Sequence, residues 1–145
     1  MSQQGRVLAL DVGEVRIGVA LSDPDRTVAL PAGTIQVAGG PQDLKAVAAL
    51  VREHDASTVV VGHPITLSGT RGAAAMRAEE FAEGLRLVLD VPVRLQDERL
   101  TTVEADRGLR AAGANAKKAR RVIDQASASL ILRAYLDRLA GKNRS

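Results

Sequence analysis

Apolar and polar residues along this chain follow two patterns, one typical of β-strands and the other of α-helices. Three short stretches rich in Val, Ile, Leu and Thr open the chain, at residues 6–11, 16–22 and 27–37. The first two are separated by only a few residues and predict a β-hairpin. The third contains Pro31 and Gly33, which predict a bent strand at the edge of a sheet.

Helical and strand patterns alternate through the rest of the chain. Residues 42–54 carry apolar side chains at helical spacing, whereas 57–62 is a continuous apolar run typical of a strand covered on both faces. The remaining expected elements are a helix at about 73–89, a strand at 92–96, and helices at 101–112 and about 117–139.

This order of elements predicts an α/β fold whose sheet is part antiparallel and part parallel. The sequence contains no internal repeat and no low-complexity tract. We therefore expect a single domain over residues 1–145, with a core at about 6–140 and disorder in the first few residues and in the tail 141–145.

Composition narrows the classes of function. One Phe, one Tyr and no Trp argue against an aromatic platform for stacking bases. The chain has no Cys, which excludes disulfides and thiolate metal sites. No apolar run approaches the roughly 20 residues of a membrane span, and no signal-peptide pattern is present. We expect a cytoplasmic protein without a membrane partner.

Charge is spread unevenly along the chain. Residues 101–145 carry ten basic and four acidic side chains, whereas residues 1–100 carry ten basic and thirteen acidic ones. Four of the basic residues are packed into one short run: Lys117, Lys118, Arg120 and Arg121. Cations at the start of a helix oppose the helix dipole, which favours a contact with nucleic-acid phosphates over a merely solvated surface.

Three acids are candidates for catalysis. Asp11 ends the first expected strand, Glu98 lies at the end of the strand at 92–96, and Asp124 lies in the last helix. Asp124 stands among residues expected to face the sheet, namely Ile123, Leu130, Ile131 and Ala134. Carboxylates at the carboxyl ends of strands, with no His or Cys cluster, suit Mg²⁺ or Mn²⁺. A pair of such ions supports hydrolysis of a phosphodiester.

The same residues also fit structural roles, and the spacing leaves both interpretations open. Asp11 can form a turn, Glu98 can pair with Arg99 or with the start of the next helix, and Asp124 stands four residues after Arg120. The glycines of residues 12–18 suit either a tight hairpin or a phosphate-binding turn.

Residues 68–72 precede a helix and suit phosphate binding with help from Arg71. His63 follows the strand at 57–62 and is more simply explained by a surface or packing role.

Taken together, these segments resemble the YqgF/RuvX family. Residues 10–23 (LDVGEVRIGVALSD) resemble its opening hairpin, 60–72 its loop after the fourth strand, 97–102 (DERLTT) its characteristic hexapeptide, and 122–132 its C-terminal helix. The resemblance implies a ribonuclease H-like fold, with a five-stranded mixed sheet flanked by α-helices. It also implies catalytic, metal-binding acids at Asp11, Glu98 and Asp124.

Members of that family are described as candidate Holliday-junction resolvases and as nucleases that mature the 5′ end of 16S rRNA precursor. The chain departs from the family at His63, where an apolar or aromatic residue is common, and at Ser68, where Asp or Asn is common. Neither departure touches the three acids.

The leading hypothesis is a two-metal endonuclease acting on precursor RNA or branched DNA. Arg16, Arg71 and Arg99 would contact phosphates together with the basic run at 117–121. Cleavage of both strands of a junction would suit a symmetric dimer, so monomer and homodimer both remain open. One alternative is a catalytically inactive nucleic-acid-binding factor in ribosome biogenesis or transcription. An ATPase of the actin and hexokinase type is disfavoured, because those folds pair two such domains.

Overall fold

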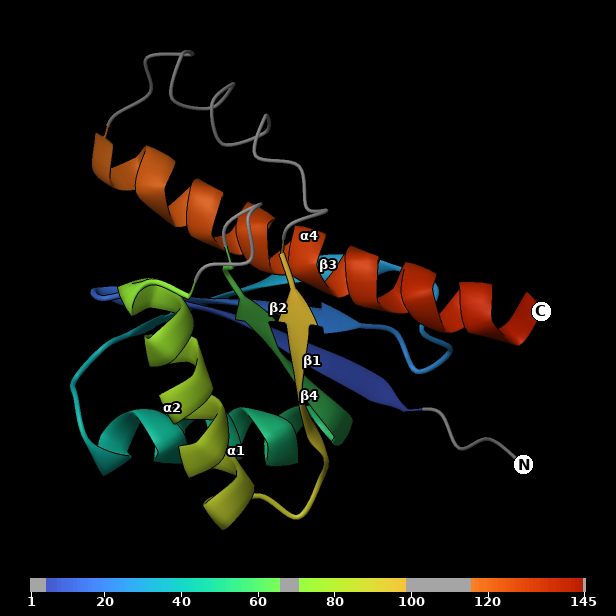
Figure 1. Ribbon diagram of the computed structural model, residues 1–145, viewed down its shortest axis with the longest axis horizontal. Coiled ribbons are helices and arrows are strands. Elements are labelled where there is room, and N and C mark those ends of the chain that lie inside the picture. The colour runs from blue at the N-terminus through green and yellow to red at the C-terminus, as the bar shows by residue number, and fades with distance from the viewer. Residues whose placement is uncertain (1–4, 66–70, 99–115, 145) are drawn as a thin grey trace.

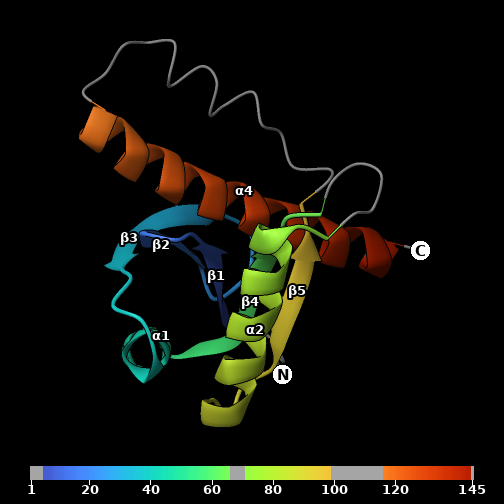
Figure 2. The ribbon, with the colours of Figure 1, turned by 60° about the vertical axis from the view of Figure 1, so that its left-hand side comes forward.

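The computed structural model describes residues 5–65, 71–98 and 116–144, with side chains in the last segment described from 126 to 141. Its elements are β1 (Arg6–Val12), β2 (Arg16–Ser22), β3 (Ala29–Gln36), α1 (Pro41–His54), β4 (Ala56–His63), α2 (Ala73–Val88), β5 (Val93–Asp97) and α4 (Ala116–Arg144). The helices α1 and α2 cover one face of the sheet and α4 crosses the other (Figures 1 and 2). The helix predicted at 101–112 lies outside the described residues.

The sheet has five strands in the order β3-β2-β1-β4-β5. β1 runs antiparallel to β2 and parallel to β4, and β5 is parallel to β4. This arrangement confirms the predicted mixed sheet and the edge position of β3. The predicted bend in β3 is also present, since Gly33 has a φ of 104° and the register with β2 shifts between Val19 and Ala20.

The turn between β1 and β2 is a tight hairpin. The Gly13 N–H donates to the Arg16 carbonyl at 3.0 Å, and a Cβ at Gly13 would lie 2.7 Å from that same oxygen. Glycine is therefore required here by close backbone approach. The hairpin interpretation of residues 12–18 is confirmed, and the Gly13 N–H is engaged within the turn.

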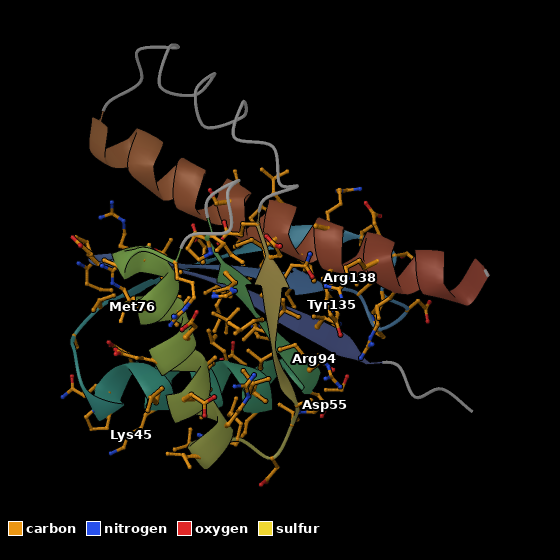
Figure 3. The ribbon with its side chains drawn as sticks, in the orientation of Figure 1. Lys45, Asp55, Met76, Arg94, Tyr135 and Arg138 are labelled. Carbon is orange, nitrogen blue, oxygen red and sulfur yellow. The ribbon has the colours of Figure 1, made fainter. Side chains whose placement is uncertain are left out.

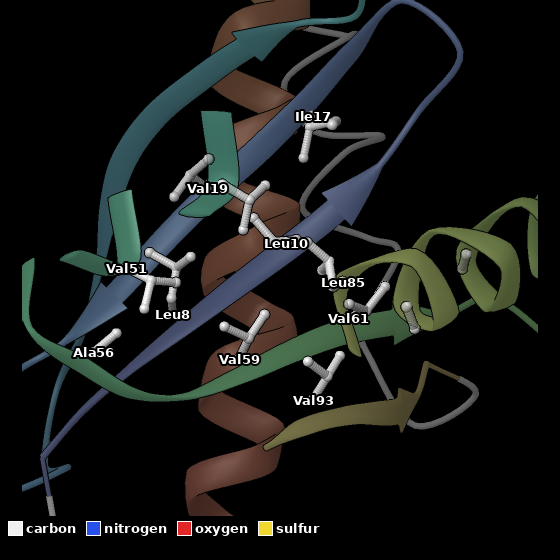
Figure 4. Close-up of a cluster of buried hydrophobic side chains, with 13 residues drawn as sticks. Leu8, Leu10, Ile17, Val19, Val51, Ala56, Val59, Val61, Leu85 and Val93 are labelled. Atoms are coloured by element: carbon white, nitrogen blue, oxygen red, sulfur yellow. The ribbon is translucent and has the colours of Figure 1, made fainter. Parts of the chain in front are cut away.

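Two apolar cores lie on opposite faces of the sheet. Alternate residues of the central strands, such as Leu8, Leu10, Val59 and Val61, pack under α1 and α2 (Figure 4). Their neighbours Val7, Ala9 and Val60 face the other way, against α4. This period of two assigns each strand residue to one face, and so determines where the residues at the strand ends point.

The part of α4 that covers the sheet differs from the predicted stripe. Its buried residues are Ala128, Ile131, Leu132, Tyr135 and Leu136, whereas Leu130 and Ala134 are half-buried. The prediction was right for Ile131. For Leu130 and Ala134 it was wrong, because the face of α4 that packs on the sheet is rotated about the helix axis relative to the predicted one.

The helix α4 also continues to Arg144, beyond the predicted end at 139 and through most of the segment expected to be a disordered tail. Basic residues near a helix C-terminus suit its dipole. Within the described part of the chain, no helix is long and apolar enough to cross a membrane.

A buried carboxylate holds the chain between β3 and α1. Asp43 is 7% exposed, and its oxygens accept the Ala38 and Gly39 N–H groups at 2.8 and 3.0 Å. We expect Asp43→Ala to lower the free energy of unfolding by about 2 kcal/mol, because two N–H groups lose a charged acceptor. Urea unfolding at neutral pH would measure this. The exposed Asp25→Ala is the control, and equal stability of both variants would contradict the prediction.

Candidate active site

Asp11 stands at the carboxyl end of β1, on the face of the sheet covered by α4. Val7 and Ala9, four and two residues earlier, pack against α4, so the period of two places Asp11 on that face as well. Its partner in β2 is Gly18. In β4 the pairing of Leu10 with Val61, extended by one residue, brings Asp11 beside Gly62. Glycines therefore flank this acid on both sides.

Glu98 reaches the same face from the other side of β4. It directly follows β5, and its N–H donates to the His63 carbonyl at 3.1 Å. A Cβ built on Gly62 would lie 2.7 Å from Glu98 Oε2 and 2.5 Å from Ile131 Cδ1 of α4. The Glu98 carboxyl group thus lies directly over Gly62, beneath α4.

These contacts bring two of the three predicted acids toward one site. β1 and β5 flank β4, so their backbones are separated by about 10 Å, two strand spacings. Asp11 therefore lies beside Gly62 in the sheet and the Glu98 carboxyl group lies over Gly62, which has no side chain to fill the space on this face. Both acids are half-buried and both make further contacts.

The third predicted acid belongs to α4. Position 124 lies within this helix, four residues before Ala128 and seven before Ile131. This spacing assigns it to the same helical stripe as those two buried residues. Its side chain lies outside the described residues, as do those of Arg99, Lys117, Lys118, Arg120 and Arg121. Among the described residues no group of three acids or histidines forms a metal cluster.

A second polar group occupies the opposite face of the same strand ends. His63 Nε2 lies 2.5 Å from Glu79 Oε2, and Arg71 donates to both oxygens of Glu79 at 2.8 and 2.5 Å. Hydrogen bonds from Arg71 and then from His63 lower the pKa of Glu79 to about 2. Arg71, predicted as a phosphate contact, is thus held by α2 while 55% of its side chain remains exposed.

This group predicts a specific dependence of stability on pH. The Glu79 pKa falls from 4.5 to about 2 on folding, so its contribution is complete above 4.5 and is lost as pH falls through about 2. We expect Glu79→Gln to be less stable than the parent at pH 6, with the difference closing toward pH 2. Denaturant unfolding between these pH values measures it, with the exposed neighbour Glu80→Gln as control. A difference independent of pH would contradict this.

Arg16 begins β2 at the same end of the sheet as Asp11 and is half-buried there. Nearby, Arg77 of α2 forms an ion pair with Glu14 of the hairpin at 3.0 Å. Neither Glu79 nor the role of Gly62 in leaving space for Glu98 was predicted from the sequence. Alternation along β4 and β5 indicates that Gly62 and Glu98 share a face but does not give the register between the strands, and nothing local marks Glu79 as the partner of His63.

The order and directions of the strands define the chain as an α/β protein with a ribonuclease H-like fold. Among solved structures, T. thermophilus RuvC in complex with Holliday junction substrate matches with a TM-score of 0.55 and 17% identity, over 93% of this chain and 96% of that one. At this identity the likeness concerns the fold, and it confirms the predicted ribonuclease H-like architecture.

The chain belongs to the RuvX family, described as Holliday junction resolvase, whose model matches residues 5–138. A protein of Mycolicibacterium paratuberculosis named as a candidate pre-16S rRNA nuclease is 50% identical over 97% of this chain and 85% of its own length. A Streptomyces avermitilis protein with the same name is 47% identical, over 97% and 92%. The predicted family is confirmed, and it is one of nucleases, which are hydrolases of phosphodiester bonds.

Proposed function

We propose that this chain is an endonuclease that requires a divalent metal and cleaves structured nucleic acid, with precursor 16S rRNA as its first candidate substrate and branched DNA as the second. The observation that supports the proposal is the position of the Glu98 carboxyl group over Gly62, since Asp11 lies beside Gly62 on the same face of the sheet. Nuclease relatives at about half identity support the reaction class. A cytoplasmic location belongs to the same proposal, since both substrates are found there.

The donor set fits a hard cation. Asp11 and Glu98 offer carboxylate oxygens, and Asp124 on the adjacent stripe of α4 would complete the set. Bound Mg²⁺ or Mn²⁺ would supply activation of water and stabilisation of the leaving oxygen. The protein's own part is to hold the carboxylates in place. The His63 carbonyl anchors the backbone of Glu98, and Ile131 closes the site from above.

Binding of the substrate backbone is assigned to the basic residues around this end of the sheet. Arg16 and Arg71 lie on β2 and immediately before α2, and Arg99 follows Glu98 directly in sequence. The run of Lys117, Lys118, Arg120 and Arg121 begins the helix that carries Asp124. Contacts of this kind give affinity that falls with salt and little sequence preference.

The test is a cleavage assay on three labelled substrates: precursor 16S rRNA, a four-way DNA junction and single-stranded DNA. Each is incubated with Mg²⁺, Mn²⁺ or EDTA. We expect cleavage that requires the metal, and the preferred substrate would separate RNA maturation from junction resolution. Binding without cleavage in any metal would overturn the proposal and favour the inactive binding factor. Size-exclusion chromatography of the protein bound to the four-way junction would show whether a monomer or a dimer binds this substrate.

A further inference from the structure

A pocket of about 640 Å³ lies at the opposite end of β4 from Asp11 and Glu98. Its lining comes from the turn after β2, the amino-terminal ends of β4 and β5, and the C-terminal half of α4. The polar residues of this lining are Arg26, Ser57, Thr58, Arg94, Tyr135 and Arg138. Thr58 and Gly62 are four residues apart on β4, or roughly 13 Å. The pocket is therefore separate from the proposed nuclease site.

Among the described residues, those that line the pocket include three arginines and no acid. Arg26 donates to the Gly5 carbonyl at 2.9 Å and to the Ser57 and Thr58 hydroxyls at 3.0 and 3.3 Å. Arg138 donates to Gln96 Oε1 at 3.1 Å. All of these acceptors are neutral, so they orient the two guanidinium groups without cancelling their charge.

Two further donors in the pocket make no hydrogen bond to the described part of the chain and are open to a ligand. They are the guanidinium of the exposed Arg94 and the hydroxyl of Tyr135, a residue whose ring is otherwise buried. Figure 3 shows Arg94, Tyr135 and Arg138 on the same side of α4. Three guanidinium groups and a hydroxyl that line one concave pocket are a set of donors suited to an anion.

Hydrogen bonds within the turn after β2 hold Arg26 in its place at the pocket. Asp23 accepts hydrogen bonds from the Thr27 and Val28 N–H groups and from the Thr27 hydroxyl. These hydrogen bonds lower the pKa of Asp23 to about 2, and the bond from the Val28 N–H has the largest effect. Arg26 itself has a φ of 60°, a left-handed conformation that an arginine seldom adopts. The fold thus accepts backbone strain at the residue that projects a guanidinium toward β4.

We propose that this pocket binds a phosphate-bearing small molecule of about mononucleotide size, with its phosphate against Arg26, Arg94 and Arg138. The volume falls within the range of about 300–1,000 Å³ typical of small-ligand sites. Pro92 and Leu139 add apolar surface for the rest of the ligand. The concave shape favours a small ligand over the backbone of a long nucleic acid, and the site stands independently of the proposed nuclease activity.

Isothermal titration calorimetry on the full chain, with EDTA present, tests this with inorganic phosphate, AMP and adenosine. We expect phosphate and AMP to bind and adenosine not to bind. Arg94→Gln should weaken AMP binding about tenfold and Tyr135→Phe about fivefold, through loss of a charged and a neutral donor. Arg52→Gln removes the same charge from an exposed position on α1 and should have no effect.

Asp11→Asn should also leave AMP binding unchanged, which separates this pocket from the nuclease site. Absence of Arg94-dependent binding of phosphate or AMP at millimolar concentration would overturn the proposal. A single-stranded oligonucleotide forms the last arm of the test. If only the oligonucleotide bound in an Arg94-dependent manner, the pocket would be a contact for the nucleic-acid backbone and the small-ligand proposal would be wrong.

Discussion

Replacing Asp11 with Asn, or Glu98 with Gln, is expected to reduce metal-dependent cleavage by about 10²–10³-fold or more, as removal of a single electrostatic group from an active site commonly does. Each substitution keeps the shape of the side chain and removes its negative charge. An amide oxygen is a much weaker ligand for a divalent cation than a carboxylate. The fold should persist, because neither acid belongs to the apolar cores.

The measurement is the single-turnover cleavage rate over a series of metal concentrations, with thermal unfolding in parallel. Asp90→Asn is the matched control, since Asp90 is an exposed acid in the turn between α2 and β5. The double variant Asp11→Asn/Glu98→Gln should be little worse than either single variant, because groups that act as a unit are not additive. Cleavage by Asp11→Asn at the parent rate would remove this acid from the mechanism.

The strands could be predicted from the sequence because each is a short run of strand-forming residues next to residues that favour a turn. Residues 16–22 and the turn before them reproduced β2 and its hairpin, and Pro31 with Gly33 correctly indicated a bent edge strand in β3. Backbone hydrogen bonding explains this success, since Pro cannot donate in the interior of a sheet. The acids at the ends of β1 and β5 followed from the same strand boundaries.

The contacts between elements were less predictable. The stripe of α4 that meets the sheet was assigned around Leu130 and Ala134, whereas Ala128 and Leu132 are buried. The faces of an alanine-rich helix differ little in hydrophobicity, so packing against the sheet determines which face is buried. The pairing of His63 with Glu79 joins residues sixteen positions apart, and only the packing of α2 on β4 brings them together.

Gly62→Ala is expected to remove most of the nuclease activity while leaving the protein folded. The added methyl group would lie 2.7 Å from Glu98 Oε2 and 2.5 Å from Ile131 Cδ1, which are both the far ends of flexible side chains. Each can turn away, so the free energy of unfolding should fall by only about 1–2 kcal/mol, as for modest overpacking. The carboxylate cannot turn away and still face Asp11, however. A displacement of about 1 Å at a reacting group can cost about 100-fold in rate.

The comparison with Gly72→Ala isolates this effect. Gly72 is the N-cap of α2 at a φ of −94°, and a Cβ there would meet nothing within 4 Å. Activity should therefore match the parent, and stability should fall by no more than about 1 kcal/mol because alanine is a poorer N-cap than glycine. Gly62→Ala should differ from it chiefly in cleavage rate, with a weakened response to metal concentration because Glu98 is displaced. Full activity in Gly62→Ala would mean that the position of the Glu98 carboxyl group over β4 is not the one used in catalysis. A large loss of stability together with activity would instead assign Gly62 to the packing of Ile131 and α4.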